Sequence, residues 1–234
     1  MVTPGGAVCD VGCDHALTDI ALISSGRSEF ALASDVREGP LAGAARNIEA
    51  AGLSGKIKTV LADGVPPRVA DLLPSDLPAT LILTGMGGML VTNILERAGG
   101  DLLAFDELVL SPQSDLGRVR NALATFGFRI ADEEMLKEDG KFYTLMRAVR
   151  GESRELSEEE ALFGPVLISR AHPVLREYLA FRLGILEGIE KQLSGGGRGP
   201  EDPRIQEVAA EKACIGRAVE EINRKGVGRN DSFL

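Results

Sequence analysis

The chain has 234 residues, of which 44% are hydrophobic and 26% charged, and its formal net charge is −9. This length allows one full α/β domain and a smaller appendage, and neither a membrane span nor a signal sequence is indicated, so we expect a cytoplasmic protein. Three unpaired cysteines predict neither a disulfide framework nor a metal site, and the acidic balance excludes indiscriminate coating of nucleic acid but not an RNA enzyme with a local basic patch.

The first predicted strand, residues 7–11, ends at a glycine and is followed by a helical pattern, the order of a nucleotide-binding α/β unit. Gly12 allows a sharp turn and the close approach of a ligand. Asp14 stands where a dinucleotide fingerprint has its second glycine, and its carboxylate would repel a pyrophosphate. A ligand with a sulfonium or ammonium group suits it better. We therefore expect S-adenosylmethionine (SAM) rather than NAD, with a structural βαβ unit as the alternative.

Acidic residues also follow the next two predicted strands. Residues 30–34 lead to Asp35, whose carboxylate can accept hydrogen bonds from both hydroxyls of a ribose. A helix starting near Pro40 precedes a third strand, residues 57–61, which leads to Asp63 and a glycine. An acid there can accept from an adenine amino group, although a lone Asp-Gly is also an ordinary turn.

The fourth predicted strand, residues 80–84, is a continuous apolar run typical of a buried central strand. It ends in a Gly-Met-Gly-Gly sequence that favours backbone shape over helix stability, as expected where a ligand or substrate presses against the chain. A fifth strand, residues 107–110, is followed by Gln113, whose amide can read a base edge.

Residues 128–130 and 142–149 predict two last strands that form an antiparallel hairpin, joined by a connection over residues 133–141. Seven strands alternating with helices predict a doubly wound, Rossmann-like α/β sheet. Such sheets bind ligands at the carboxyl ends of their strands. The residues expected at those ends are Asp10, Asp14, Asp35, Asp63 and Gly85.

The composition changes near residue 151, which predicts domains at residues 1–151 and 152–234. Apolar stripes at residues 175–193 and 205–222, joined by a glycine-rich turn at 194–200, predict an antiparallel coiled-coil hairpin. The hairpin can cover the sheet, dimerise or offer cations to a polyanion, but its many glutamates are equally consistent with a solvated face. The cations concerned are Arg176, Arg182, Lys191, Arg198, Arg204 and Arg217.

With these motifs in place, the chain resembles the bacterial tRNA (adenine-22-N1)-methyltransferases, the TrmK family. The matching motifs are Asp10-Val-Gly-Cys-Asp-His15, Ala33-Ser-Asp35, Gly39-Pro40-Leu41, Asn47-Ile48, Ala62-Asp-Gly64, Thr84-Gly-Met-Gly-Gly88, Ser111-Pro-Gln113 and Glu138-Asp-Gly-Lys-Phe-Tyr143. The resemblance implies a class I SAM-dependent methyltransferase that acts on N1 of adenine 22 in tRNA. The predicted alternatives are a methyltransferase for a small molecule or protein, and a non-catalytic RNA-binding protein with the same fold.

Two departures from the family are expected to weaken SAM binding. Ala16-Leu17 stands where the family usually has Gly-Tyr. Few residues precede the first strand, so the chain lacks most of the helix that in the family precedes this strand and helps close the cofactor site. The chain lacks an Asn-Pro-Pro-Tyr motif, which disfavours methylation of an exocyclic amine.

The resemblance and the motifs together assign roles to individual residues. Asp14 and Gln113 are the catalytic candidates. The cofactor-binding candidates are Asp10, Gly12, Asp14, His15, Asp35, Val36, Asp63, Gly64, Gly85, Met86 and Gly87. The candidates for substrate contacts are Arg118, Lys141 and Tyr143. We expect SAM as cofactor, tRNA as partner, no metal or membrane partner, and a monomer or weak homodimer.

Overall fold

The computed structural model describes residues 1–195, 199 and 201–230, which form two compact units. The first unit comprises Met1–Asp132 and Thr144–Arg154, and the second comprises Glu133–Tyr143 and the chain from Glu155 onward. The domain boundary near residue 151 stays a prediction. Most of the predicted glycine-rich turn, including Arg198, lies outside the described residues.

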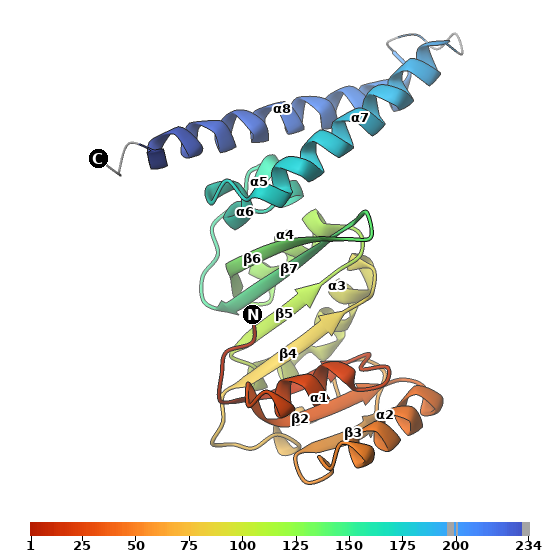
Figure 1. The fold of residues 1–234 in the computed structure, drawn as a ribbon, viewed down its shortest axis with the longest axis vertical. Helices are drawn as coiled ribbons and strands as arrows, with labels where there is room; N and C mark the ends of the chain where they lie inside the picture. Colours follow the sequence, from red (N-terminus) through yellow and green to blue (C-terminus); the bar gives the residue numbers. More distant parts are fainter. Residues whose placement is uncertain (196–198, 200, 231–234) are drawn as a thin grey trace. The chain divides into compact units, whose positions relative to one another are not determined.

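The sheet has seven strands in the order β3-β2-β1-β4-β5-β7-β6 (Figure 1). β1 to β5 pair in parallel and β7 pairs antiparallel to β5. The order reverses at β1, which lies between β2 and β4, so a crevice is expected at the carboxyl ends of these strands. This arrangement confirms the predicted doubly wound, Rossmann-like sheet. The strands are Gly6–Val11 (β1), Ser28–Asp35 (β2), Ile57–Leu61 (β3), Ala79–Thr84 (β4), Glu107–Ser111 (β5), Phe128–Glu138 (β6) and Lys141–Arg150 (β7).

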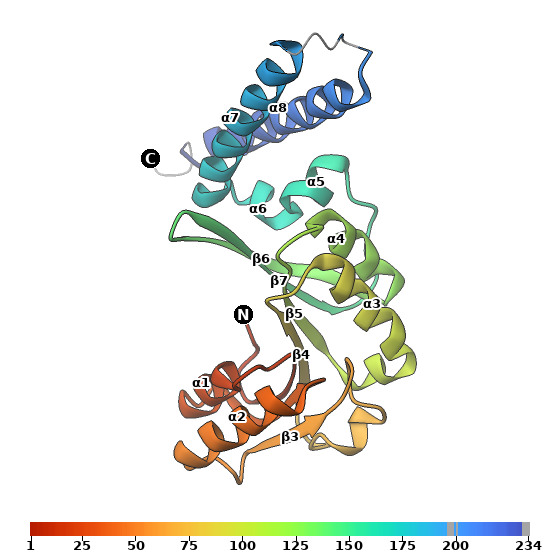
Figure 2. The same cartoon turned by 90° about the vertical axis from the view of Figure 1, so that its right-hand side faces the viewer.

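Helices cover both faces of the sheet (Figure 2). One face packs against α1 (Leu17–Ser24) and α2 (Glu38–Ala50), and the other against α3 (Gly88–Ala98) and α4 (Leu116–Thr125). Short 3₁₀ turns, Val69–Asp71 (η1) and Gly99–Ala104 (η2), complete the loops. Because side chains alternate along a strand, Cys9 joins the α3–α4 core while Val8 joins the α1–α2 core. Asp10 therefore lies on the α1 side of the sheet.

Two predicted boundaries are wrong. β6 continues to Glu138, so most of the predicted 133–141 connection is strand, and only Asp139 and Gly140 form the turn. The many charged residues there concealed a strand alternation in which Glu133 and Met135 are buried. Helix α2 begins at Glu38 rather than at Pro40, which still falls in the first turn, where its missing N–H costs nothing.

The second unit is helical beyond the tip of the β6–β7 hairpin. α5 (Glu158–Phe163) and α6 (Pro165–Ser169) precede two long helices, α7 (Pro173–Gly195) and α8 (Pro203–Asn230). The predicted apolar stripes meet in one core that includes Leu175, Leu179, Leu186, Val208, Ile215 and Ile222. Within the described range, no helix combines the length and apolar character needed to cross a membrane.

Ion pairs connect α7 and α8 of this hairpin. Arg182 donates to Glu211 at 2.5 Å, and Lys212 donates to Glu190 at 2.6 Å. Arg182 and Lys212 are the two cations that interrupt the apolar stripes, and each is neutralised by the facing helix. This confirms the predicted helical hairpin, while the coiled-coil description stays a prediction.

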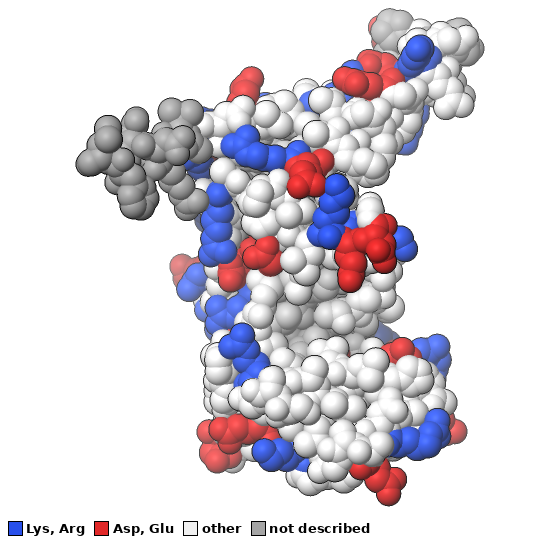
Figure 3. Space-filling model, viewed as in Figure 1, with Lys and Arg blue, Asp and Glu red and all other residues white. Residues whose placement is uncertain are grey.

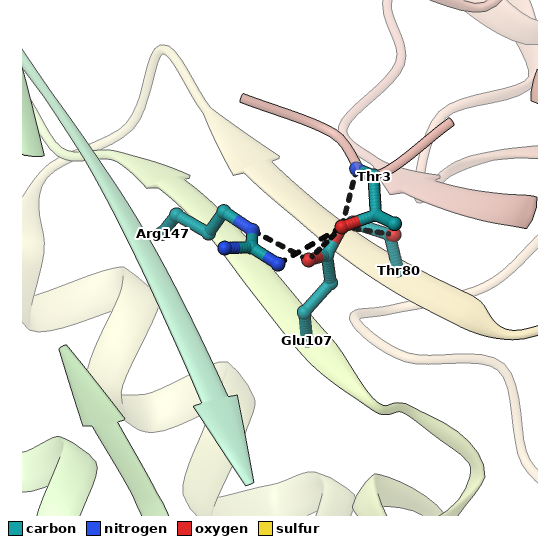
Figure 4. A network of polar contacts seen from close by, with 4 residues as sticks. All are labelled: Thr3, Thr80, Glu107 and Arg147. Atoms are coloured by element: carbon teal, nitrogen blue, oxygen red, sulfur yellow. Dashed lines mark hydrogen bonds and ion pairs between the residues drawn. The ribbon is translucent and has the colours of Figure 1, made fainter. Parts of the chain in front are cut away.

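A buried carboxylate joins four segments at the amino end of the sheet (Figure 4). Glu107 of β5 accepts hydrogen bonds at 2.8 Å from the Thr3 N–H, the Thr3 hydroxyl and the Thr80 hydroxyl. Arg147 of β7 donates to it at 2.6 Å. Burial opposes ionisation of Glu107, but these hydrogen bonds outweigh it and hold the pKa of the carboxyl below its usual range. The network fastens the N-terminal segment and β7 to the central strands.

Replacing this carboxylate should cost stability. We expect Glu107→Ala to lower the free energy of unfolding by about 2–3 kcal/mol, because Arg147 and Thr80 lose a charged acceptor. The loss should shrink as the pH falls through the depressed pKa of Glu107, since a protonated carboxyl no longer pairs with Arg147. Urea denaturation at several pH values measures it. Glu96→Ala on the exposed face of α3 is the control, and an equal effect of both variants would contradict the prediction.

Candidate functional site

A pocket of about 480 Å³ opens at the carboxyl ends of β1 and β4 in the first unit. Five of the predicted cofactor residues line it: Asp10, Gly12, Asp14, His15 and Gly85. The sequence analysis did not assign the other five to the site: Cys13, Leu17, Thr18, Arg37 and Thr84. Cys13 and Thr84 lie inside the motifs quoted for the resemblance, and Leu17 lies in the departure expected to weaken SAM binding. The signal for Arg37 is that a cation two residues after a strand-end acid can reach back to it. The pocket lies where the reversed strand order places a ligand.

The loop after β1 has an unusual backbone. Gly12, Asp14 and Ala16 all have positive φ, at 79°, 50° and 56°. The two non-glycine residues each cost on the order of 1 kcal/mol in this region, and such strain concentrates at ligand sites. The loop is held by the N–H groups of Gly12 and Cys13, which both donate to the Ser34 carbonyl at 2.8 and 2.9 Å. A glycine at position 16 would avoid the strain that Ala16 carries.

Helix α2 supports the same loop from outside the pocket. The Asn47 side chain donates to the His15 carbonyl oxygen at 3.0 Å. The His15 ring lies so close to Gly43 that a Cβ at position 43 would be 2.6 Å from Nδ1. Neither position was assigned to the site from sequence, although Asn47 lies in a family motif. These contacts fix where His15 can stand.

Asp35 ends β2 as predicted and is only 4% exposed. Its Oδ1 accepts the Arg37 backbone N–H at 2.9 Å and lies 3.5 Å from Arg37 Nε. Oδ2 accepts no hydrogen bond from the described part of the chain, so it can receive a ligand hydroxyl. Val36 follows with an exposed apolar side chain that can face a ligand ring.

Asp63 and Gly64 are not among the residues that line the pocket, and neither are the predicted cofactor residues Asp35, Val36, Met86 and Gly87. Arg97 of α3 donates hydrogen bonds to both carboxylate oxygens of Asp63, from Nη1 to Oδ2 at 2.7 Å and from Nη2 to Oδ1 at 3.1 Å. The hydrogen bonds and charge of Arg97 lower the pKa of the Asp63 carboxyl. A ligand amino group at Asp63 would therefore share the carboxylate with Arg97, a partner that sequence spacing did not reveal.

The loops after β4 and β5 meet beside the pocket. The Gln113 N–H donates to the Met86 carbonyl oxygen at 2.9 Å. The Met86 methyl group is 3.1 Å from where a Cβ on Gly12 would stand, so it closes on the β1 loop. Gly88 is required because a Cβ there would be 2.4 Å from the Ser114 carbonyl oxygen. The predicted catalytic Gln113 is thus anchored to the Gly-Met-Gly-Gly turn that contains Gly87.

None of the three predicted substrate residues is among those that line the pocket. Arg118 Nε donates to the Thr92 hydroxyl of α3 at 3.3 Å. Lys141 and Tyr143 belong to the second unit, where Tyr143 is partly exposed.

Two buried carboxyl groups belong to β1 and α1, and only Asp10 of the two is among the residues that line the pocket. Asp10 is 3% exposed and Asp19, in the first turn of α1, is fully buried. Burial is the main cause that raises the pKa of Asp10 from 3.8 to about 7, with Asp35 adding to it. Burial and the Asp10 charge raise the pKa of Asp19 to about 8. Burial also raises the pKa of the Cys13 thiol to about 12, so it is not a nucleophile at neutral pH. The site is rich in carboxyl groups and short of cations.

Comparisons with known proteins place this geometry in a family. Residues 8–223 match the family model for tRNA (adenine(22)-N(1))-methyltransferase, TrmK. The chain belongs to the TrmK family. This confirms the predicted enzyme class, a SAM-dependent tRNA (adenine-N1)-methyltransferase.

Individual TrmK relatives cover nearly the same span. The tRNA (adenine(22)-N(1))-methyltransferase of Bacillus subtilis is 27% identical over 197 residues, which are 82% of this chain and 81% of the relative. The crystal structure of Streptococcus pneumoniae Sp1610 has a TM-score of 0.84 at 31% identity and covers 93% of this chain and 94% of that one. Its complex with SAM has a TM-score of 0.79 at 30% identity, with the same coverage.

The contact between Gly43 and His15 can be tested directly. We expect Gly43→Ala to weaken SAM binding roughly tenfold, about 1.4 kcal/mol, because the added methyl group must displace the His15 ring. Isothermal titration calorimetry with SAM measures the change. Gly39→Ala on the same helix is the matched control, since a Cβ there has nothing within 4 Å. Equal SAM affinities in the two variants would contradict the role of His15.

Proposed function

We propose that the pocket at the carboxyl ends of β1 and β4 holds SAM and that the chain transfers its methyl group to N1 of adenine 22 in tRNA. The observation that carries this proposal is the acidic pocket at the strand-order reversal of a TrmK-family fold. Carboxylates attract the sulfonium and ammonium groups of SAM and would repel the pyrophosphate of a dinucleotide.

The residues present fit this cofactor. We assign the ribose hydroxyls to Asp35, because its Oδ2 is available inside a buried strand end. Asp14 and His15 suit the amino-acid end, since both line the pocket and lie on the strained loop. Asp63, shared with Arg97, and Gly64 suit the adenine. Gly85, with open space around its Cα and positive φ, leaves a path from cofactor to target base.

The chemistry asked of the side chains is mainly positioning. When bound, SAM supplies a methyl group already activated by its sulfonium, so the chain must hold adenine N1 in line with it. N1 has a lone pair at neutral pH, and the methylated base is cationic. A carboxylate such as Asp14 lowers the energy of that developing charge, and Gln113 can hold the base edge.

The proposed transfer involves no metal ion, and the absence of a metal stays a prediction. In the described part of the chain, one group of acids and a thiol is close enough for a metal: Glu158, Glu159 and Cys214. Arg217 already forms ion pairs with both of these glutamates. We infer that this cluster is structural.

For the RNA we propose contacts from Arg118, Lys141 and Tyr143. Basic and acidic side chains are interspersed on the face shown in Figure 3, so local cations rather than a continuous basic surface would meet the phosphates. In the helical hairpin Arg176, Arg182, Arg204 and Arg217 already have side-chain partners, which favours the solvated-face interpretation there. We retain a cytoplasmic monomer or weak homodimer, divided near residue 151, as part of the proposal.

The reaction is tested with labelled SAM and an unmodified tRNA transcript that has adenine at position 22. We expect N1-methyladenosine in the digested product, and a loss of at least about 100-fold in kcat/KM for Asp35→Asn because the ribose acceptor is weakened. Asp76→Asn in an exposed loop is the matched control. Equal labelling of a transcript with guanine at position 22 would overturn the proposed target.

The role of Gln113 separates the base from the cofactor. We expect Gln113→Ala to lower kcat/KM for tRNA about tenfold or more while leaving the Kd for SAM unchanged, because the amide contacts only the target base. Steady-state kinetics together with calorimetry measure both quantities. A parallel loss of SAM affinity would assign Gln113 to the cofactor side instead.

A further inference from the structure

Asp19 is a buried acid that the reaction described above does not use. It lies in the first turn of α1 and is fully buried. Within the described residues, no N–H or O–H group of another side chain or peptide donates to either of its carboxylate oxygens. The Asp10 carboxyl is within hydrogen-bonding reach of it. Because an ionised carboxylate only accepts, a hydrogen bond between two carboxyl groups requires a proton on one of them.

Within the part of the chain that the structure describes, no cation is among the groups that shift the pKa values of this pair. Outside the pair itself, the side chain that acts on it electrostatically is Asp35 of β2, another acid. The two acids in turn add to the burial that raises the pKa of the Cys9 and Cys13 thiols. Ala44 of α2 and Ile82 of β4 belong to the apolar core on the α1–α2 face of the sheet. The nearby cation Arg37 faces another acid, since its Nε lies 3.5 Å from Asp35 Oδ1. A proton is therefore the counter-charge that the folded chain itself provides.

Asp10 connects the pair to the pocket. Its side chain belongs to the pocket lining, whereas Asp19 is not among the lining residues. A positive ligand in the pocket and a proton on the pair thus compete to neutralise the same carboxyl groups. SAM has a net positive charge, because its sulfonium and ammonium groups outnumber its carboxylate.

We propose that Asp19 is a positioning residue that acts through Asp10, and that binding of SAM in this pocket displaces the proton that the two carboxyls share. The inference rests on the proposed cofactor pocket. The proton leaves to solvent, and no covalent bond changes. Methyl transfer converts the sulfonium into a neutral thioether, so the product S-adenosylhomocysteine (SAH) displaces the proton less.

The proposal predicts how affinity changes with pH. In the free protein burial keeps the carboxyls protonated up to about pH 7–8, so a ligand that needs them ionised binds better as the pH rises. With one proton displaced, SAM affinity should rise by up to about tenfold per pH unit as the pH approaches that range, and level off above it. SAH should show a shallower rise.

The same proton binding predicts that the stability of the folded chain falls as the pH rises, whereas the affinity for SAM increases. The folded chain binds these protons more tightly than the unfolded chain, whose aspartates titrate near 3.8. The contribution of the pair to stability is therefore full below about pH 4 and is lost as the pH rises to about 8. Asp19→Asn removes the second acid without changing its size, so its melting temperature relative to the unchanged chain should increase with pH.

The deciding experiment is calorimetry of SAM binding to the full chain at pH 6 to 9, in pairs of buffers with different ionisation enthalpies. The dependence of the heat on the buffer counts the protons released. We expect close to one proton released near pH 7 by the unchanged chain and by the Asp76→Asn control, and far less by Asp19→Asn. Thermal denaturation over the same pH range shows that each variant is folded.

The outcomes distinguish the role of Asp19 from the assignment of the pocket to SAM. SAM binding without proton release, or with equal release from Asp19→Asn, would overturn the role of Asp19 and leave the pocket assignment standing. Absence of SAM binding in the folded, unchanged chain would overturn both. A steeper pH dependence for SAH than for SAM would also contradict the proposal, because it would exclude the sulfonium charge as the cause.

Discussion

The concentration of carboxyl groups at the carboxyl ends of β1 and β2 is the constraint on which the site depends. Asp10 and Asp35 stand on adjacent parallel strands, Asp14 on the strained loop that follows β1, and Asp19 on the helix beyond it. Four acids in so small a volume destabilise the folded chain unless protons or cations accompany them. We propose that a cationic cofactor bound at these acids offsets this cost.

At the amino end of the same sheet, a buried acid is surrounded by hydrogen-bond donors. Glu107 is as deeply buried as Asp35, but three hydroxyl or peptide donors and Arg147 satisfy it. A carboxylate whose oxygens all accept hydrogen bonds stabilises its surroundings. Carboxyl groups with few donors around them instead bind a proton or a cationic ligand more readily. The amino end of the sheet is thus built for stability and the carboxyl end for binding.

The helical hairpin follows the stabilising pattern. The cations that interrupt its apolar stripes are neutralised by acids on the facing helix, as Arg182 is by Glu211. Such pairs specify the direction and register of two helices that apolar contacts alone would leave less defined. This use of its cations is a reason to seek RNA contacts elsewhere in the chain.

Local sequence determined much of this protein. Apolar runs that stop at glycine or aspartate marked β1 to β5 and placed Asp10, Asp35 and Gly85 at strand ends, because strand periodicity and turn chemistry are short-range properties. The prediction of strand bounds from apolar runs failed where charged residues occupy a strand, as in β6, because an exposed strand face carries no apolar signal. Only the tertiary structure brought Arg97 to Asp63, the His15 ring to Gly43, and Asp19 to Asp10. These pairs come from different elements, and the packing of helices on the sheet, rather than spacing along the chain, decides which side chains meet.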